Sequence, residues 1–181
     1  MSQESVKQAL LAKIQAVQEN PAQARLVFRA STALVEDVKC TAQVRDFAPL
    51  TIDEPPDLGG SDTGVNPVEL VLVALGTCQE IMYSAYAAVM GVKLDEVKID
   101  VKGYLDVRGL LSMDESVPAG YEKIVYDTQI KSSADPESIQ KVIAMAESHC
   151  PLLDMMQRPV EITGEVKLNG KRLETTAEAA A

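Results

Sequence analysis

Two cysteines offer the clearest chemistry in this sequence. Cys78 lies inside a long apolar segment, and Cys150 stands at the end of a second helical segment, in the run Ser148-His149-Cys150-Pro151. Each falls on the expected buried face of its helix, at helical spacing from other apolar residues. Buried thiols are either small core residues or members of a redox pair, and the two readings imply different functions.

Polar neighbours in the sequence affect how reactive these thiols can be. His149 can donate to a thiolate and lower its pKa, or it can interact with the helix dipole as an exposed residue. Glu69 has a structural role available as the capping-box partner of Asn66. Glu80 lies about 200° around the helix from Cys78, so it does not point into the same space.

Arg29 and Arg45 both lie in segments that the sequence predicts as strands. Either guanidinium can stabilise a thiolate or bind a peroxide oxygen, although a solvated strand face is the commoner place for such a side chain. Cys40 falls on the apolar face of a strand and is predicted to be a core residue. Because no two cysteines share the short spacing of a zinc site and the sequence has one histidine, we expect no zinc site and no other metal centre.

Charge and the N-terminal sequence narrow the possible partners. The net charge of −10 at pH 7 opposes binding to nucleic-acid phosphates and to anionic lipid. The polar N-terminus lacks the apolar stretch of a signal peptide, and the apolar run at 68–75 is too short to span a bilayer. We therefore expect a cytoplasmic protein with no membrane or nucleic-acid partner, in which the cysteines are thiols or a catalytic pair.

The hydrophobic pattern predicts blocks of helix and strand. Helices are expected at 3–19, 67–90 and 136–150, and strands at 25–35, 38–47, 49–53, 96–107, 121–131 and 160–168. Asn66 and Pro67 mark the start of the second helix, and Gly91 marks its end. Antiparallel strands interleaved with helices of different character indicate an α+β fold, with a sheet packed on the two cysteine-bearing helices.

The same pattern divides the chain into three parts. Residues 1–21 are predicted to be an N-terminal helical extension, residues 22–169 the main domain, and residues 170–181 a flexible C-terminal tail. With 46% apolar residues among 181, the chain can fill the core of one domain.

The longest motif ends at the first cysteine. The run Gly-Val-Asn-Pro-Val-Glu-Leu-Val-Leu-Val-Ala-Leu-Gly-Thr-Cys ends at Cys78, and His149-Cys150-Pro151-Leu152 follows about seventy residues later. In order and spacing these motifs resemble the OsmC/Ohr family of osmotically inducible and organic-hydroperoxide-resistance proteins, in a divergent OsmC-like branch. The resemblance covers about residues 25–169. It implies antiparallel sheets wrapped around two long central helices in an intertwined homodimer, with active sites at the subunit interface.

The resemblance also implies a thiol peroxidase. Cys78 matches the peroxidatic cysteine, which attacks a hydroperoxide and becomes a sulfenic acid. Cys150 matches the resolving cysteine, which condenses with the sulfenic acid to give a disulfide. The implied partners are an organic hydroperoxide substrate, an external dithiol reductant and a second copy of the chain, and no cofactor is implied.

One position departs from the peroxidase branch. In that branch a glutamate directly after the helix-start proline pairs with an activating arginine, whereas here Val68 has this position and the carboxylate is at Glu69. By resemblance, Glu69 and Arg45 are the candidate activating pair, and Arg29 competes with Arg45. The alternative function is a non-catalytic or redox-sensing relative that binds a small apolar ligand at the dimer interface.

Overall fold

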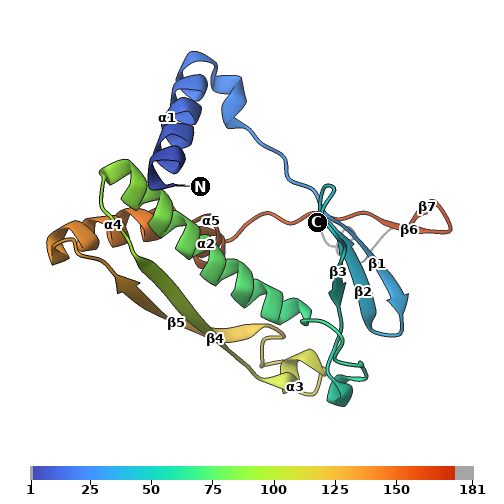
Figure 1. Cartoon of the computed structure of the whole chain (residues 1–181). Helices are drawn as coiled ribbons and strands as arrows, with labels where there is room; N and C mark the ends of the chain where they lie inside the picture. The colour runs from blue at the N-terminus through green and yellow to red at the C-terminus, as the bar shows by residue number, and fades with distance from the viewer. Residues whose placement is uncertain (1, 174–181) are drawn as a thin grey trace.

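The structure is a computed structural model that describes residues 2–173. Its elements in chain order are α1 (Gln3–Glu19), η1 (Pro21–Ala24), β1 (Ser31–Glu36), β2 (Lys39–Gln43), β3 (Leu50–Ile52), η2 (Pro56–Leu58), α2 (Pro67–Met90), β4 (Glu96–Leu105), α3 (Val107–Leu110), β5 (Tyr121–Lys131), α4 (Pro136–Ser148), α5 (Pro151–Gln157), β6 (Val166–Leu168) and β7 (Lys171–Leu173). We call the helices α1, α2, α4 and α5 with the β4–β5 ribbon the packed region. The β1–β2–β3 sheet and the β6–β7 hairpin project away from it and form the projecting region (Figure 1).

The long helix α2 begins and ends where its sequence predicts. The Asn66 side chain accepts the Glu69 backbone N–H at 2.8 Å, and the Glu69 carboxylate accepts the Asn66 N–H at 2.9 Å, which completes a capping box. Pro67 occupies the first helical position. Gly91 ends the helix with a φ of +70°, a conformation that costs glycine little because it has no Cβ.

The core lies between α2, α4 and the β4–β5 ribbon. Its fully buried members are Tyr83, Ala87, Val142 and Ala146, against which apolar residues of the ribbon pack. The helix comes close to the ribbon at Gly76. A Cβ at that position would lie 3.2 Å from a methyl group of Val101, so even alanine would require Val101 to move by a few tenths of an ångström.

The projecting region depends more on local polar contacts. All six residues of β1 are exposed, and Phe28 in the segment before it is 88% exposed. Buried Asp53 accepts the Thr63 hydroxyl at 2.6 Å and pairs with Lys39 at 3.9 Å, which fixes the loop after β3. The hydrogen bond from the Thr63 side chain is the largest of the effects that lower the pKa of Asp53 to about 2.

Several predicted strands are shorter than expected. The strand predicted at 25–35 begins only at Ser31, the one predicted at 38–47 ends at Gln43, and the one predicted at 160–168 is a strand only from Val166. The parts left out are extended or turned chain that joins no strand ladder among the described residues. Their apolar composition predicted a strand, but the structure supplies no neighbouring strand within this chain.

Two segments predicted to be irregular contain regular structure. The short helix α3 begins with a cap from Asp106, just ahead of the loop predicted at 109–120. Strand β7 falls in the predicted tail, and it pairs with β6 through a turn in which Asn169 and Gly170 both have positive φ. Asn-Gly is a strong hairpin signal, which the sequence analysis missed. Residues 174–181 of that predicted tail lie outside the described residues.

Helix α2 is long and apolar enough to cross a membrane, and it is the single such helix among residues 2–173. The sequence analysis counted only 68–75 and so underestimated the apolar length. The core helix of a soluble protein meets the same criterion. In this protein α2 packs against α1, α4 and β4, and the absence of a membrane partner stays a prediction.

Candidate functional site

The structure places Cys78 and Cys150 side by side. Cys78 lies in the middle of α2, Cys150 lies at the turn between α4 and α5, and the two thiols are close enough for Cys150 to raise the pKa of Cys78. Neither takes part in a disulfide. Cys150 is fully buried, whereas Cys78 is partly exposed. Cys78 is therefore the more accessible residue of the pair.

The turn that carries Cys150 is a break between two helices. His149 caps the end of α4, and Cys150 is the N-cap of α5, with Pro151 as the first helical residue. The prediction that the first of these helices runs through position 150 is wrong, because a residue before proline is disfavoured in helical conformation. The break leaves the backbone N–H of Leu152 free to donate to the sulfur of Cys78.

The environment of Cys78 disfavours a thiolate within a single chain. Burial is the main influence and raises the pKa of the thiol above its usual value, the Leu152 N–H lowers it, and the neighbouring Cys150 raises it further. No basic side chain within residues 2–173 contributes to this balance. Formation of a thiolate at Cys78 is therefore expected to require a cation from elsewhere.

The candidate activating residues are not assembled around the thiols in this chain. The Glu69 carboxylate is engaged in the capping box at the start of α2. Arg45 lies in an exposed turn after β2, with its guanidinium 4.5 Å from the centre of the Phe47 ring. Arg29 is exposed in the segment before β1. The structure thus brings together the two cysteines but neither arginine.

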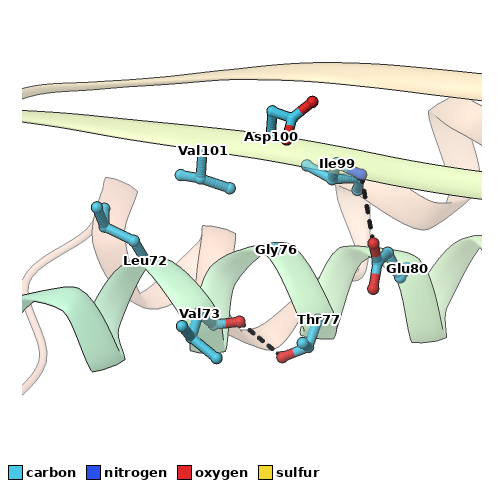
Figure 2. Close-up of a pocket in the computed structure, with 8 residues that line it drawn as sticks. All are labelled: Leu72, Val73, Gly76, Thr77, Glu80, Ile99, Asp100 and Val101. Atoms are coloured by element: carbon cyan, nitrogen blue, oxygen red, sulfur yellow. Dashed lines mark hydrogen bonds between the residues drawn. The ribbon is translucent and has the colours of Figure 1, made fainter. Parts of the chain in front are cut away.

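Two other polar residues near the cysteines have structural partners. Glu80 borders a hollow of about 280 Å³ between α2 and β4, where its carboxylate accepts the Ile99 N–H at 3.3 Å (Figure 2). His149 lies with Nδ1 3.0 Å from the carbonyl oxygen of Met145, as a helix-terminal histidine does. Among residues 2–173, no group of three or more His, Cys, Asp or Glu side chains is arranged to hold a metal ion.

A cavity of about 340 Å³ lies about one helical turn from each cysteine, and neither cysteine lines it. Leu75 lines it from one turn before Cys78, and Leu153 lines it from one turn after Cys150. The other walls are Tyr121, Glu122, Lys123, Ile124, Tyr126, Met156 and Gln157. The volume lies at the small end of the range for ligand sites, ~300–1,000 Å³, and the walls combine apolar side chains with charged and polar ones.

A protein-family model, that of the OsmC-like proteins, matches residues 59–165. This match covers more than half of the chain and includes both cysteines. The chain belongs to the OsmC family.

Individual OsmC relatives are distant. YmaD of Bacillus subtilis strain 168, an uncharacterised protein, is 27% identical over 129 residues, which cover 67% of this chain and 81% of YmaD. A hydroperoxide reductase of Mycoplasma genitalium is 26% identical over 120 residues, which cover 66% of this chain and 80% of that protein. An OsmC-like protein from Mycoplasma pneumoniae has a crystal structure that superposes with a TM-score of 0.63 at 20% identity, covering 73% of this chain and 88% of that one. The predicted α+β fold with antiparallel sheets is confirmed.

The OsmC-like site also contains buried polar residues that the sequence analysis missed. Gln79 is 1% exposed, and neither its amide nitrogen nor its amide oxygen has a hydrogen-bond partner among the described residues. Nearby, Glu147 accepts hydrogen bonds from Tyr83 and Tyr126. A signal was present in the sequence, because Gln79 interrupts the most buried stripe of α2 between Leu75 and Tyr83.

Proposed function

We propose that this OsmC-family protein is a cytoplasmic thiol peroxidase that reduces organic hydroperoxides, with Cys78 as the peroxidatic cysteine and Cys150 as the resolving cysteine. The observation that carries the proposal is the contact between a partly exposed thiol on α2 and a buried thiol at a helix break. A sulfenic acid formed at the first position has a thiol beside it with which to condense. The hydroperoxide reductase relative, at 26% identity, gives independent support.

The proposed chemistry has three steps. The Cys78 thiolate attacks the distal peroxide oxygen, the O–O bond breaks, and the departing alkoxide takes up a proton to become an alcohol. The Cys150 thiol then attacks the sulfenic sulfur, an S–S bond forms, the S–O bond breaks, and the hydroxide leaves with the thiol proton as water. An external dithiol reduces the disulfide by exchange and restores both thiols. The apolar residues of the neighbouring cavity, Leu75, Leu153 and Met156 among them, favour a hydroperoxide with an organic substituent.

Activation of Cys78 is assigned to a second copy of the chain. The raised pKa of Cys78 makes the thiolate scarce at neutral pH, and a guanidinium next to the sulfur would lower that pKa. Arg45 is our first candidate, and Arg29 the second. Both are exposed in the projecting region, which leaves their guanidinium groups available to a neighbouring molecule.

The accessible surface supports a homodimer. The chain exposes 13514 Å². A compact monomer of this mass is expected to expose about 8,500 Å². Exposed apolar side chains on α2 and before β1, among them Ile81 at 66% and Phe28 at 88%, contribute to the excess. An intertwined second copy would cover such residues in an obligate interface of more than ~2,000 Å².

The rival function is a non-catalytic or redox-sensing protein that binds a small apolar ligand at the dimer interface. Two observations favour it: the pKa of Cys78 is raised, and Glu69 is engaged as a cap rather than beside a thiol. In that case the cavity beside the cysteines would hold the ligand, and neither thiol would turn over hydroperoxide.

The two functions are separated by variants made in a Cys40→Ser background, so that only the two site thiols react. With cumene hydroperoxide and dithiothreitol, the Cys40→Ser parent should turn over and Cys78→Ser should not, because a hydroxyl is a far poorer nucleophile than a thiolate. Treated with cumene hydroperoxide in the absence of dithiothreitol, Cys150→Ser should be oxidised once and then stop at the sulfenic acid or over-oxidise, whereas the parent should form the disulfide. If the parent consumes no hydroperoxide, or if both variants match it, the binding function replaces the peroxidase.

A further inference from the structure

One carboxylate oxygen joins three elements behind the thiol pair. Oε1 of Glu147, in the last turn of α4, accepts the hydroxyl of Tyr83 from α2 at 3.1 Å and the hydroxyl of Tyr126 from β5 at 3.2 Å. We call these three residues the tyrosine clamp. Hydrogen bonds to a charged acceptor are among the stronger ones in proteins, so the clamp fixes the end of α4 against its two neighbours.

The clamp lies close in sequence to both cysteines. Tyr83 follows Cys78 by five residues on the same helix, and Glu147 precedes Cys150 by three. The Cys150 N–H donates to the Glu147 carbonyl at 3.4 Å, a long bond at the point where the helix breaks. The clamp therefore ties the helix of one cysteine to the turn that carries the other.

Polar side chains are buried around the tyrosine clamp, at a place where apolar side chains would make the fold more stable. Next to Cys78, the buried Gln79 side chain lies close enough to the Tyr126 hydroxyl to lower the pKa of that tyrosine, but neither of its amide atoms makes a hydrogen bond of good geometry among the described residues. Burying polar atoms without partners destabilises a fold, and a half-buried carboxylate adds to that cost. Stability alone does not account for such a cluster beside two thiols.

We propose that Glu147 is a positioning residue for disulfide formation, acting through Tyr83 and Tyr126. The inference rests on the proposed peroxidase function. In the second step the Cys150 sulfur must approach the sulfenic sulfur of Cys78 opposite the departing hydroxide, and the two Cα atoms must lie within ~4.4–6.8 Å. A turn next to proline has no continuous helical ladder to hold it, and the clamp supplies that restraint.

If Glu147 has this role, its loss should affect the second oxidation step and not the first. The first step involves Cys78 and the hydroperoxide alone, so it does not depend on where the turn lies. The second step competes with attack of another hydroperoxide on the sulfenic acid, which gives a sulfinic acid. A loosened turn should therefore slow disulfide formation and divert Cys78 to over-oxidation, without slowing the first oxidation.

The test compares variants in the Cys40→Ser background. Glu147→Leu removes the acceptor, Tyr126→Phe removes one donor at nearly constant volume, and Glu147→Gln keeps an oxygen that can accept both hydroxyls. Glu137→Gln, on the exposed face of the same helix and paired with Lys141, is the matched control. Each protein is oxidised with cumene hydroperoxide in the presence of dimedone, and mass spectrometry gives the ratio of trapped or over-oxidised Cys78 to disulfide.

We expect Glu147→Leu to raise this ratio about tenfold, within the losses known for misplaced reacting groups. Tyr126→Phe should raise it less, Glu147→Gln should recover most of the disulfide, and Glu137→Gln should match the parent. The rate of the first oxidation, followed by loss of free thiol at Cys78, should stay the same in both Glu147 variants and in Glu137→Gln, none of which changes a residue that lines the cavity. An unchanged ratio in both Glu147→Leu and Tyr126→Phe, or equal slowing of both steps in Glu147→Leu, would overturn the proposal.

A separate measurement tests the positioning role of Glu147 independently of the proposed peroxidase activity. The disulfide is formed with oxidised dithiothreitol and equilibrated against increasing concentrations of the reduced reagent, without any hydroperoxide. The parent disulfide should withstand about tenfold more reductant than that of Glu147→Leu, because a positioned pair has the higher effective concentration. Equal resistance overturns the clamp, whether or not the parent reacts with hydroperoxide.

Discussion

The packed region buries Tyr83, Ala87, Val142 and Ala146 almost completely, whereas the projecting region exposes every residue of β1. Both regions contain strands with apolar residues. In the packed region these residues meet a helix of the same chain, whereas in β1 of the projecting region they meet solvent. A sequence pattern therefore predicts that a surface is to be covered, but it does not say which molecule covers it.

The same contrast applies to the candidate site. The thiol pair is assembled inside the packed region by α2 and the α4–α5 turn, while both candidate activating arginines lie in the projecting region. This division is the physical reason for placing the activating cation on a second copy. If the proposal is right, the chemistry of the packed region depends on contacts that only a dimer can make.

The largest effect, on both dimerisation and turnover, is expected from charges placed on the exposed apolar faces. Phe28→Asp and Ile81→Asp leave single-chain packing almost untouched, since both side chains are largely exposed. In a dimer, each would bury an unpaired carboxylate, which is strongly unfavourable. We expect a shift from dimer to monomer in sedimentation at micromolar concentration, and a loss of hydroperoxide turnover by more than ~tenfold.

The matched control is Ala144→Asp, which adds the same charge to the exposed side of α4. It should leave both the sedimentation coefficient and the turnover close to those of the parent. The proposal of a dimer would be contradicted if the parent already sediments as a monomer. It would also be contradicted if Phe28→Asp and Ile81→Asp both behave like Ala144→Asp, because the exposed apolar faces would then simply be solvated.

Replacement of the activating arginine is the second test. Loss of a cation next to Cys78 raises the thiol pKa, so less thiolate exists at pH 7 and the thiol reacts more slowly. An increase of about one unit in the pKa of Cys78 corresponds to about a tenfold slower alkylation of that thiol by iodoacetamide at pH 7. We expect a tenfold slower alkylation in Arg45→Ala and a partly recovered rate in Arg45→Lys. Arg29→Ala should be alkylated at the rate of the parent.

Alkylation is measured at Cys78 by peptide mapping, across a pH range that brackets the change. If the Arg29→Ala protein slows instead, the assignment moves to that residue. If neither slows, no arginine of the projecting region activates the thiol.

Local signals in the sequence predicted most of the packed region correctly. Asn66, Pro67 and Gly91 gave both ends of α2, and α1 and β5 were predicted at their observed bounds. These features depend on contacts within a few residues, which a pattern in the sequence records. The strand predicted at 25–35 was too long, because pairing depends on a neighbour that its own residues do not specify.

The candidate site was only partly predictable for a similar reason. The spacing of Cys78 and Cys150 placed both on buried faces, but the break before Pro151 and the clamp at Glu147 arise from how distant segments pack. The clamp brings together residues from three elements, and each of them has an ordinary place in its own helix or strand. Roles of Arg45, Arg29 and Glu69 stay predictions, since they depend on a second copy or on activity.

Acid should loosen the loop after β3, because protonation of Asp53 weakens the contacts that hold this loop. Its pKa is lowered to about 2, so the carboxylate contributes stability above the pKa of the unfolded chain, ~3.9, and this contribution is lost as pH falls toward 2. In Asp53→Asn that contribution is absent at every pH. Limited proteolysis of the loop at 54–64 should therefore be faster in the variant than in the parent at pH 6, and the two should converge toward pH 2. Equal cleavage at pH 6 would mean that the loop is held by its other contacts.

The smallest effect is expected at the cap of α2, the one predicted site residue with a clear structural role. Glu69→Ala removes the acceptor for the Asn66 N–H, and should lower the free energy of unfolding by ~0.3–1.5 kcal/mol in urea titrations. Glu69→Gln keeps an amide oxygen at that place and should lose less. Because the carboxylate serves the helix end, turnover per folded dimer should change by less than ~twofold in both variants. If Glu69→Gln instead slows hydroperoxide turnover as strongly as loss of the activating arginine, while its stability stays that of the parent, the carboxylate reaches the thiol site in the dimer. The packed region would then also depend on the second copy for the geometry at the start of its central helix.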